Sequence, residues 1–231
     1  MHQPDDDAAV GKRARRDRPC SLVKIGGSLL DLPDLTARLG ALLDQLDRPV
    51  ALLVGGGPAA DAVRKWATVF EIGESVSHWL AIDSLSLTAR LVCELLNRDG
   101  VFQRSGSESA VIVDHWPAAC DAVERGLIPL LNPRGLLASV DDQPGIQLPE
   151  SWVATSDSIA ASIAIQWSVP QLILCKSVDV PPNGLLAELA TGPTDSLPVD
   201  DWFGHLAPQL GDIQWCNLRS SAVRCVPWRP L

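Results

Sequence analysis

Two runs of glycine, each directly after a short apolar segment, constrain the fold of this chain more than any other feature of its sequence. The apolar segments are residues 22–25 and 50–54, and the glycines that follow them are Gly26, Gly27, Gly55, Gly56 and Gly57. A short apolar segment is typical of a strand that is buried on both faces. Glycine is costly in backbone entropy, so consecutive glycines after such a strand predict a tight turn that a ligand approaches closely.

Further along the chain, apolar residues at helical spacing alternate with short apolar segments. Helices are expected from Pro33 to residue 46, after residue 57, over 78–96, over 117–125, from Thr155 onward and near 201–209. Strands are expected over 110–113, 127–131 and 172–174, with short ones near 213–217 and 222–226. The segment 132–149 is rich in Gly, Pro and Asp and is expected to be a long loop or an edge hairpin. The alternation predicts an α/β fold, a three-layer sandwich whose mainly parallel sheet is covered by helices on both faces.

Length and charge restrict the classes of function. Residues 1–19 are expected to form a flexible tail and residues 20–231 one domain, because 231 residues suffice for a single α/β core. The net charge of −9 opposes binding to nucleic acid or to an anionic membrane. No apolar run is long enough to span a bilayer, and the first residues lack the apolar core of a signal peptide. The six cysteines form no CxxC pair and fit no zinc pattern, so we expect a cytoplasmic protein with reduced thiols and no metal site of its own.

Charged residues follow two of the predicted strands at one edge of the sheet. Lys24 stands at the end of the first strand, Lys176 follows the strand 172–174, and Asp157 lies in the first turn of the helix that begins near Thr155. Ligands of such sheets bind at the carboxyl ends of the strands. Two lysines would neutralise charge on a transferred phosphoryl group, an aspartate between them would hold both ammonium groups, and the glycine turns would supply N–H donors.

Each of these signals also has a simpler explanation. Gly26 and Gly27 alone fit a plain turn from strand to helix, segment 155–158 consists of ordinary helix-capping residues, and a lone lysine is usually solvated. The glycine run 55–57 lacks the GxGxxG spacing of a dinucleotide site and the GK[ST] ending of a Walker A loop. Taken together, the elements favour a site for a small anionic substrate and a polyphosphate over a nicotinamide site.

The same motifs carry a resemblance to a known family. The string Lys24-Ile25-Gly26-Gly27-Ser28, the glycine run 55–57 and the Asp-Ser-x-Ala-Ala helix that begins at Asp157 resemble the amino acid kinase superfamily, which includes acetylglutamate, uridylate and isopentenyl phosphate kinases. The resemblance covers most of residues 21–180 and is weaker beyond. It implies an ATP-dependent kinase that uses Mg²⁺ and forms a homo-oligomer.

The resemblance also implies roles for individual residues. Lys24 and Lys176 would contact the ATP phosphates, Asp157 would orient both lysines, and the remaining nucleotide-binding residues would be Gly26, Gly27, Ser28, Ser177 and Asp179. The acceptor would be approached by Gly55, Gly56, Gly57, His78 and Arg64. His78 could equally be a buried helix residue whose hydrogen bonds are satisfied within the protein. Arg64 and Asp61 could equally be ordinary charges on the surface of a helix.

A narrower resemblance is to the kinase branch associated with methanofuran biosynthesis, whose archaeal members phosphorylate (5-(aminomethyl)furan-3-yl)methyl phosphate. It rests on the strings that begin at Gly55, His78, Leu148, Thr155 and Lys176. The chain departs from the family where Pro181-Pro182 follow Val180 in place of a glycine, near the expected nucleotide base, and where Val153-Ala154 precede Thr155. A kinase of the same fold with another acceptor (uridylate, isopentenyl phosphate or an acetylglutamate-like carboxylate) and a non-catalytic nucleotide-binding homologue therefore remain as alternatives.

Overall fold

A computed structural model describes residues 21–46, 49–100, 109–138, 148–181 and 198–228. The expected tail, residues 1–19, lies outside the described residues, as does half of the segment 132–149.

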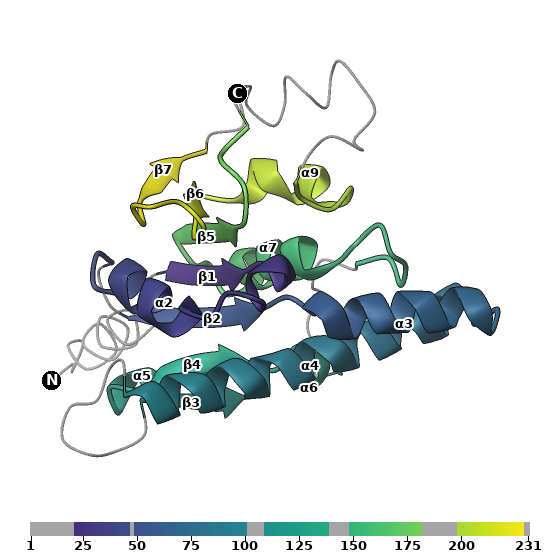
Figure 1. Cartoon of the computed structure of the whole chain (residues 1–231), viewed down its shortest axis with the longest axis horizontal. Helices are drawn as coiled ribbons and strands as arrows, with labels where there is room; N and C mark the ends of the chain where they lie inside the picture. The colour runs from purple at the N-terminus through teal and green to yellow at the C-terminus, as the bar shows by residue number, and fades with distance from the viewer. Residues whose placement is uncertain (1–20, 47–48, 101–108, 139–147, 182–197, 229–231) are drawn as a thin grey trace, which may run out of the picture.

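One seven-stranded sheet forms the centre of the molecule, in the order β3-β4-β2-β1-β5-β6-β7 (Figure 1). The strands are β1 (Ser21–Ile25), β2 (Val50–Val54), β3 (Ala110–Val113), β4 (Ile128–Leu131), β5 (Gln171–Lys176), β6 (Asp212–Asn217) and β7 (Cys225–Pro227). All neighbouring strands are parallel except β6 and β7. In the register, Ile25 lies between Val54 and Cys175, so the three central strands end level with one another.

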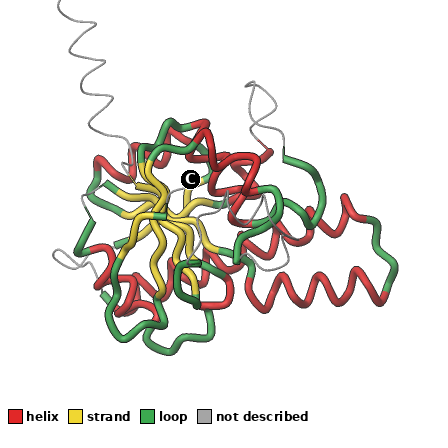
Figure 2. The backbone as a smooth tube through the Cα atoms, turned by 90° about the horizontal axis from the view of Figure 1, so that it is seen from above, coloured by secondary structure: helices red, strands yellow, loops and turns green. Residues whose placement is uncertain are grey.

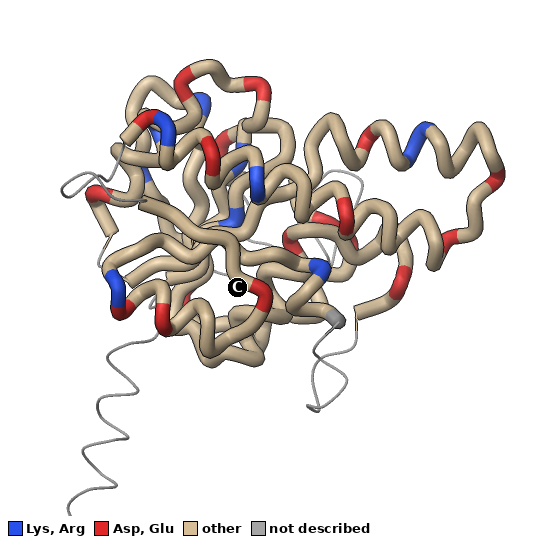
Figure 3. The backbone as a smooth tube through the Cα atoms, turned by 90° about the horizontal axis from the view of Figure 1, so that it is seen from below, with Lys and Arg blue, Asp and Glu red and all other residues tan. Residues whose placement is uncertain are grey.

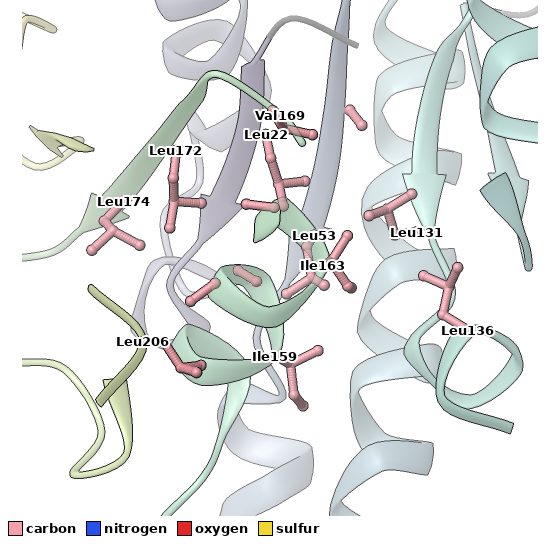
Figure 4. Close-up of a cluster of buried hydrophobic side chains, with 14 of the residues drawn as sticks. Leu22, Leu53, Leu131, Leu136, Ile159, Ile163, Val169, Leu172, Leu174 and Leu206 are labelled. Carbon is pink, nitrogen blue, oxygen red and sulfur yellow. The ribbon is translucent and has the colours of Figure 1, made fainter. Parts of the chain in front are cut away.

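Helices cover both faces of this sheet. They are α2 (Leu35–Leu43), α3 (Gly57–Val69), α4 (Glu74–Asp99), α5 (Trp116–Glu124), α6 (Pro133–Ala138), α7 (Ser156–Gln166) and α9 (Phe203–Leu206), with short 3₁₀ turns at Gly27–Leu29 and Ala207–Gln209. Alternate residues of a strand point to opposite faces. Leu22 therefore packs with Ile159 and Ile163 of α7 (Figure 4). Val23 packs with Leu39 of α2 on the other side. The predicted three-layer α/β fold is confirmed.

Helices α3 and α4 form an antiparallel pair that extends beyond the sheet (Figures 1 and 2). Helix α4 begins at Glu74, four residues before the expected start at His78, and ends at Asp99, where the C-cap residue Gly100 takes the left-handed conformation that glycine adopts readily. On α3, Val63 is buried but Trp66 is 53% exposed, so the buried apolar face of this helix is narrow. Basic and acidic positions are interspersed along the backbone (Figure 3), and no helix within the described residues is long and apolar enough to cross a membrane.

The expected loop after residue 132 is wrong in its first part, because residues Pro133–Ala138 form helix α6. Proline fits the first turn of a helix, where its missing N–H has no partner to lose. Gly135 lies against Asp114, and a Cβ at this position would come within 2.7 Å of the Asp114 side chain. The glycine therefore permits close packing of a helix, rather than marking a loop.

Candidate functional site

Two buried lysines share one buried carboxylate at the carboxyl ends of β1 and β5. Lys24 Nζ lies 2.7 Å from Asp157 Oδ1, and Lys176 Nζ lies 2.7 Å from Asp157 Oδ2. The strand period explains this convergence. Leu22 and Leu174 belong to the cluster packed on α7, so the residues two positions further along each strand, Lys24 and Lys176, point to the same side. Asp157 meets them from the first turn of α7.

The charges in this cluster influence one another strongly. Burial raises the pKa of Asp157, but the positive charges of Lys176 and Lys24 outweigh it and lower that pKa from 3.8 to about 2. Burial is the main cause that lowers the pKa of Lys176 from 10.5 to about 8, with Asp157 acting in the opposite direction. At neutral pH, Asp157 is therefore ionised and Lys176 carries a proton.

The two glycine turns touch each other. A Cβ on Gly27 would lie 2.3 Å from the backbone nitrogen of Gly57, and Gly57 itself has a φ of +51°, which favours glycine. The N–H groups of Gly26 and Gly55 donate to Cys175 O and Ile25 O, both at 2.8 Å, and so extend the sheet. The glycines thus serve first to let the turns pack, and those that line the adjacent cavity are Gly27, Gly56 and Gly57.

That cavity has a volume of about 480 Å³ and lies between the glycine turns, α4 and the start of α7. Its wall on α4 is mostly apolar, with Ala81, Ile82 and Leu85, and Trp152 adds an aromatic ring. The volume suits a small molecule, and the lining suits one with an apolar or aromatic body.

Two arginines line the same cavity, each held by an aspartate. Arg64 pairs with Asp61 at 2.9 Å, and its guanidinium group lies 4.5 Å from the centre of the Trp152 ring. Arg219 donates to Asp31 Oδ1 at 2.5 Å and to the carbonyl of Ser28 at 2.9 Å. A guanidinium group fixed in this way is well suited to bind a phosphate or a carboxylate. Arg64 thus lies where the sequence placed it, whereas Arg219 was missed.

The signal that could have revealed Arg219 is its position. It follows β6, whose carboxyl end lies at the same edge of the sheet as Lys24 and Lys176, but no motif surrounds it. Sequence reasoning assigned only a short strand to this segment.

His78 also lines the cavity, and its ring nitrogen Nδ1 lies 3.1 Å from the carbonyl oxygen of Ser151. A carbonyl can only accept, so Nδ1 carries the hydrogen and Nε2 of the neutral ring is an acceptor. Burial lowers the pKa of His78 from 6.5, so the neutral ring predominates at pH 7. A contact from Nε2 to a phosphate oxygen requires the doubly protonated ring, which a bound anion would favour.

The other predicted nucleotide residues gather beside the lysine cluster. Ser28 Oγ donates to Ser177 Oγ at 3.0 Å, which joins the turns after β1 and β5. Asp179 Oδ1 accepts from Asn217 Nδ2 at 2.8 Å, and so is paired with the end of β6. The structure thus brings every predicted site residue to one edge of the sheet. Within the described residues, no group of three or more His, Cys, Asp or Glu side chains is arranged to hold a metal ion.

Comparisons with known proteins agree with this geometry. The sequence model of the amino acid kinase family matches residues 19–180. A curated relative, the [5-(aminomethyl)furan-3-yl]methyl phosphate kinase of Methanocaldococcus jannaschii, is 28% identical over 162 residues, which are 68% of this chain and 66% of that protein. The match therefore spans slightly less than two thirds of the relative's length.

Solved structures share the fold at low sequence identity. The uridylate kinase of Archaeoglobus fulgidus has a TM-score of 0.56 and 16% identity, with 84% of this chain and 88% of that chain covered. The UMP kinase of Ureaplasma parvum has a TM-score of 0.60 and 14% identity, with 89% and 92% covered. At these identities the likeness supports the fold alone.

Proposed function

This chain belongs to the amino acid kinase family, and we propose that it transfers the γ-phosphoryl group of ATP to a small phosphomonoester. The observation that carries the proposal is the bridge from Asp157 to Lys24 and Lys176, with both nitrogen–oxygen distances at 2.7 Å, directly beside a cavity with two arginines.

Phosphoryl transfer needs positioning and charge stabilisation more than a protein nucleophile. An oxygen of the acceptor phosphate would attack the γ-phosphorus, the bond to the β-phosphate oxygen would break, and ADP would leave. The ammonium groups of Lys24 and Lys176 would stabilise the negative charge on the transferred group. Asp157 keeps both ammonium groups in place before the substrates arrive. Mg²⁺, which accompanies ATP in kinases, would be held mainly by phosphate oxygens and water, as this ion prefers.

We propose (5-(aminomethyl)furan-3-yl)methyl phosphate as the acceptor, in the synthesis of a methanofuran-type cofactor for one-carbon metabolism. The cavity supports an acceptor that combines a phosphate with a flat ring, because Arg64 and Arg219 supply cationic groups and Trp152 supplies an aromatic surface. The activity of the archaeal relative supports the same choice. Uridylate, isopentenyl phosphate and acetylglutamate are the competing acceptors of this fold.

The test is ADP release from Mg²⁺-ATP with the furan phosphate, uridylate, isopentenyl phosphate and acetylglutamate offered separately. Turnover with the furan phosphate is expected. Turnover with another acceptor would keep the kinase and discard the furan substrate, and ATP binding without turnover on any of them would indicate a non-catalytic nucleotide-binding protein.

A matched pair of variants tests the role of the lysine cluster. Lys24→Ala is expected to abolish turnover without unfolding the chain, whereas Lys65→Ala, at an exposed position of α3, is expected to leave it unchanged. An active Lys24→Ala enzyme would refute the mechanism.

The outer face of α4 supports the proposal of a homo-oligomer. Val76, Leu80, Leu87 and Leu91 are 59%, 37%, 61% and 47% exposed and recur at helical spacing along one side. A second copy of the chain would remove this apolar stripe from water. Light scattering is expected to give at least twice the monomer mass, and Leu87→Asp is expected to lower the measured mass. A monomeric mass for the unmodified chain would contradict the proposal.

Use of ATP and reduced cysteines fits a cytoplasmic location.

A further inference from the structure

The carboxylate of Asp200 accepts six hydrogen bonds at the start of helix α7. Its Oδ2 accepts from the backbone N–H groups of Thr155 at 3.0 Å, Asp157 at 3.1 Å and Ser158 at 3.0 Å, and from the Thr155 hydroxyl at 2.9 Å. Its Oδ1 accepts from the Phe203 N–H at 3.2 Å and from the Ser158 hydroxyl. Because all six groups donate, the ionised form of Asp200 satisfies them.

This arrangement replaces the local helix cap that the sequence led us to expect. Thr155 is the N-cap residue of α7, but its side chain accepts no hydrogen bond from the helix. Its hydroxyl donates to Asp200 instead, and so does the first turn of the helix. A carboxylate at this end is also favoured by the helix dipole. The cap of α7 therefore comes from a residue 43 positions after Asp157.

The segment that carries Asp200 also contacts the second lysine. The carbonyl oxygen of Pro198 accepts from Lys176 Nζ at 2.5 Å, beside the bond from the same nitrogen to Asp157. Residues 198–200 thus hold two members of the charged cluster. The side chain of Asp200 binds the backbone N–H of Asp157, and the backbone carbonyl of Pro198 binds the ammonium group of Lys176. Asp200 itself is not among the residues that line the cavity.

We propose that Asp200 is a positioning residue for phosphoryl transfer, which fixes the first turn of α7 so that Asp157 holds the ammonium groups of Lys24 and Lys176 in register with the nucleotide phosphates. The proposal rests on the function proposed above. Asp200 acts through Asp157 and Lys176 and touches neither substrate. Its loss should therefore lower kcat as well as the pKa of Lys176, whereas the loss of a cap that only stabilises the helix would leave kcat as it is.

Lys176 reports on this arrangement because several charged groups of the described residues face it. The groups that face it are Asp157 on α7, Lys24 on β1, Asp200 in the segment before α9, and the ring of Trp215 on β6 at 5.8 Å. Burial and the charge of Lys24 lower the pKa of Lys176, whereas Asp157 and Asp200 raise it. An asparagine at position 200 removes the negative charge of Asp200 and holds Asp157 less firmly beside Lys176. The pKa of Lys176 should therefore fall, so that its ammonium group loses the proton at a lower pH.

The chain contains four lysines, Lys12, Lys24, Lys65 and Lys176, so lysine-selective ¹³C NMR of the full chain gives few signals to assign. In the unmodified protein Lys176 is expected to titrate near pH 8. In Asp200→Asn the midpoint should fall measurably, and in the matched control Asp201→Asn, at an exposed position, it should not move. A folded Asp200→Asn protein with an unchanged Lys176 titration would overturn the proposal.

Kinetics supply a second readout. With whichever acceptor supports turnover, Asp200→Asn is expected to lower kcat at least tenfold at pH 7 and to move the alkaline fall of kcat/KM to lower pH, while Asp201→Asn behaves as the unmodified enzyme. A lower melting temperature with unchanged kcat would show a helix cap alone. If Asp200→Asn does not fold, Ser158→Ala removes one bond to the carboxylate and should shift both readouts in the same direction by less; no shift would refute the role. The lysine titration needs no acceptor, so an unchanged Lys176 midpoint refutes the role of Asp200 even if the proposed substrate is wrong.

Discussion

Replacing Asp157 with asparagine keeps the size of the side chain and removes the carboxylate that lies 2.7 Å from both lysine nitrogens. The two lysines lower the pKa of Asp157 from 3.8 to about 2, and at about 1.4 kcal/mol per pKa unit this corresponds to roughly 2 kcal/mol of stability at neutral pH. Removing one member of a buried ion pair also leaves the other members uncompensated, for which roughly 3–5 kcal/mol is typical. We therefore expect the free energy of unfolding to fall by roughly 2–5 kcal/mol at pH 7.

Urea denaturation at constant salt measures this loss, and its dependence on pH tests the cause. The pKa of Asp157 is lower in the folded state, so its contribution is complete above the unfolded pKa of 3.8 and is lost as the pH falls through about 2. The difference between the variant and the unmodified chain should shrink in that window. Adding Lys176→Met to Asp157→Asn should cost less than the two single changes together, because an unpaired ammonium group is removed. Additive losses, or an Asp157→Asn variant as stable as the unmodified chain at pH 7, would refute the reasoning.

Three further predictions follow from the same site. The kcat/KM of the unmodified enzyme should fall as the pH rises through about 8, because Lys176 loses its charge there; a profile that stays flat to pH 10 would contradict this. Gly57→Ala should lower the unfolding free energy by about 1–3 kcal/mol in urea melts, since φ is +51° and the new Cβ would lie 2.7 Å from Gly27 O, whereas Gly73→Ala, with nothing within 4 Å, should not. Arg219→Ala should raise the acceptor KM about tenfold in steady-state assays at an unchanged melting temperature, as expected for one charged hydrogen bond; an unchanged KM would remove Arg219 from the acceptor site.

The sequence predicted those parts of the site that depend on short-range patterns. Lys24 is the last but one residue of β1 and Lys176 is the last residue of β5, each two positions after a leucine of the same face, so their common face follows from the strand period. Asp157 could be assigned from its motif. The site residues that were missed lie where no local pattern exists. Asp200 stands between a proline-rich segment and a short helix, and its partners at the start of α7 are 42 to 45 residues away in the chain.

Glycine was the least reliable guide to local structure. In the run 55–57 it correctly predicted a tight turn, but the reason is contact between two backbones as well as room for a ligand. Gly135 contributed to the prediction of a loop, but the chain forms α6 there. Packing against Asp114 outweighs the low helix propensity of glycine at this position. Contacts between segments that are far apart in the chain produce no recognisable pattern in the sequence around either segment.

The long separation between Asp157 and its cap also orders the events of protein synthesis. A ribosome makes Lys24, Asp157 and Lys176 before it reaches Asp200, and at about 5–20 residues per second the 43 intervening residues take roughly 2–9 seconds. Lys176 is added during that interval, while the first turn of α7 has donors without their acceptor. The charged centre is thus completed only after the segment that carries Asp200 has been made.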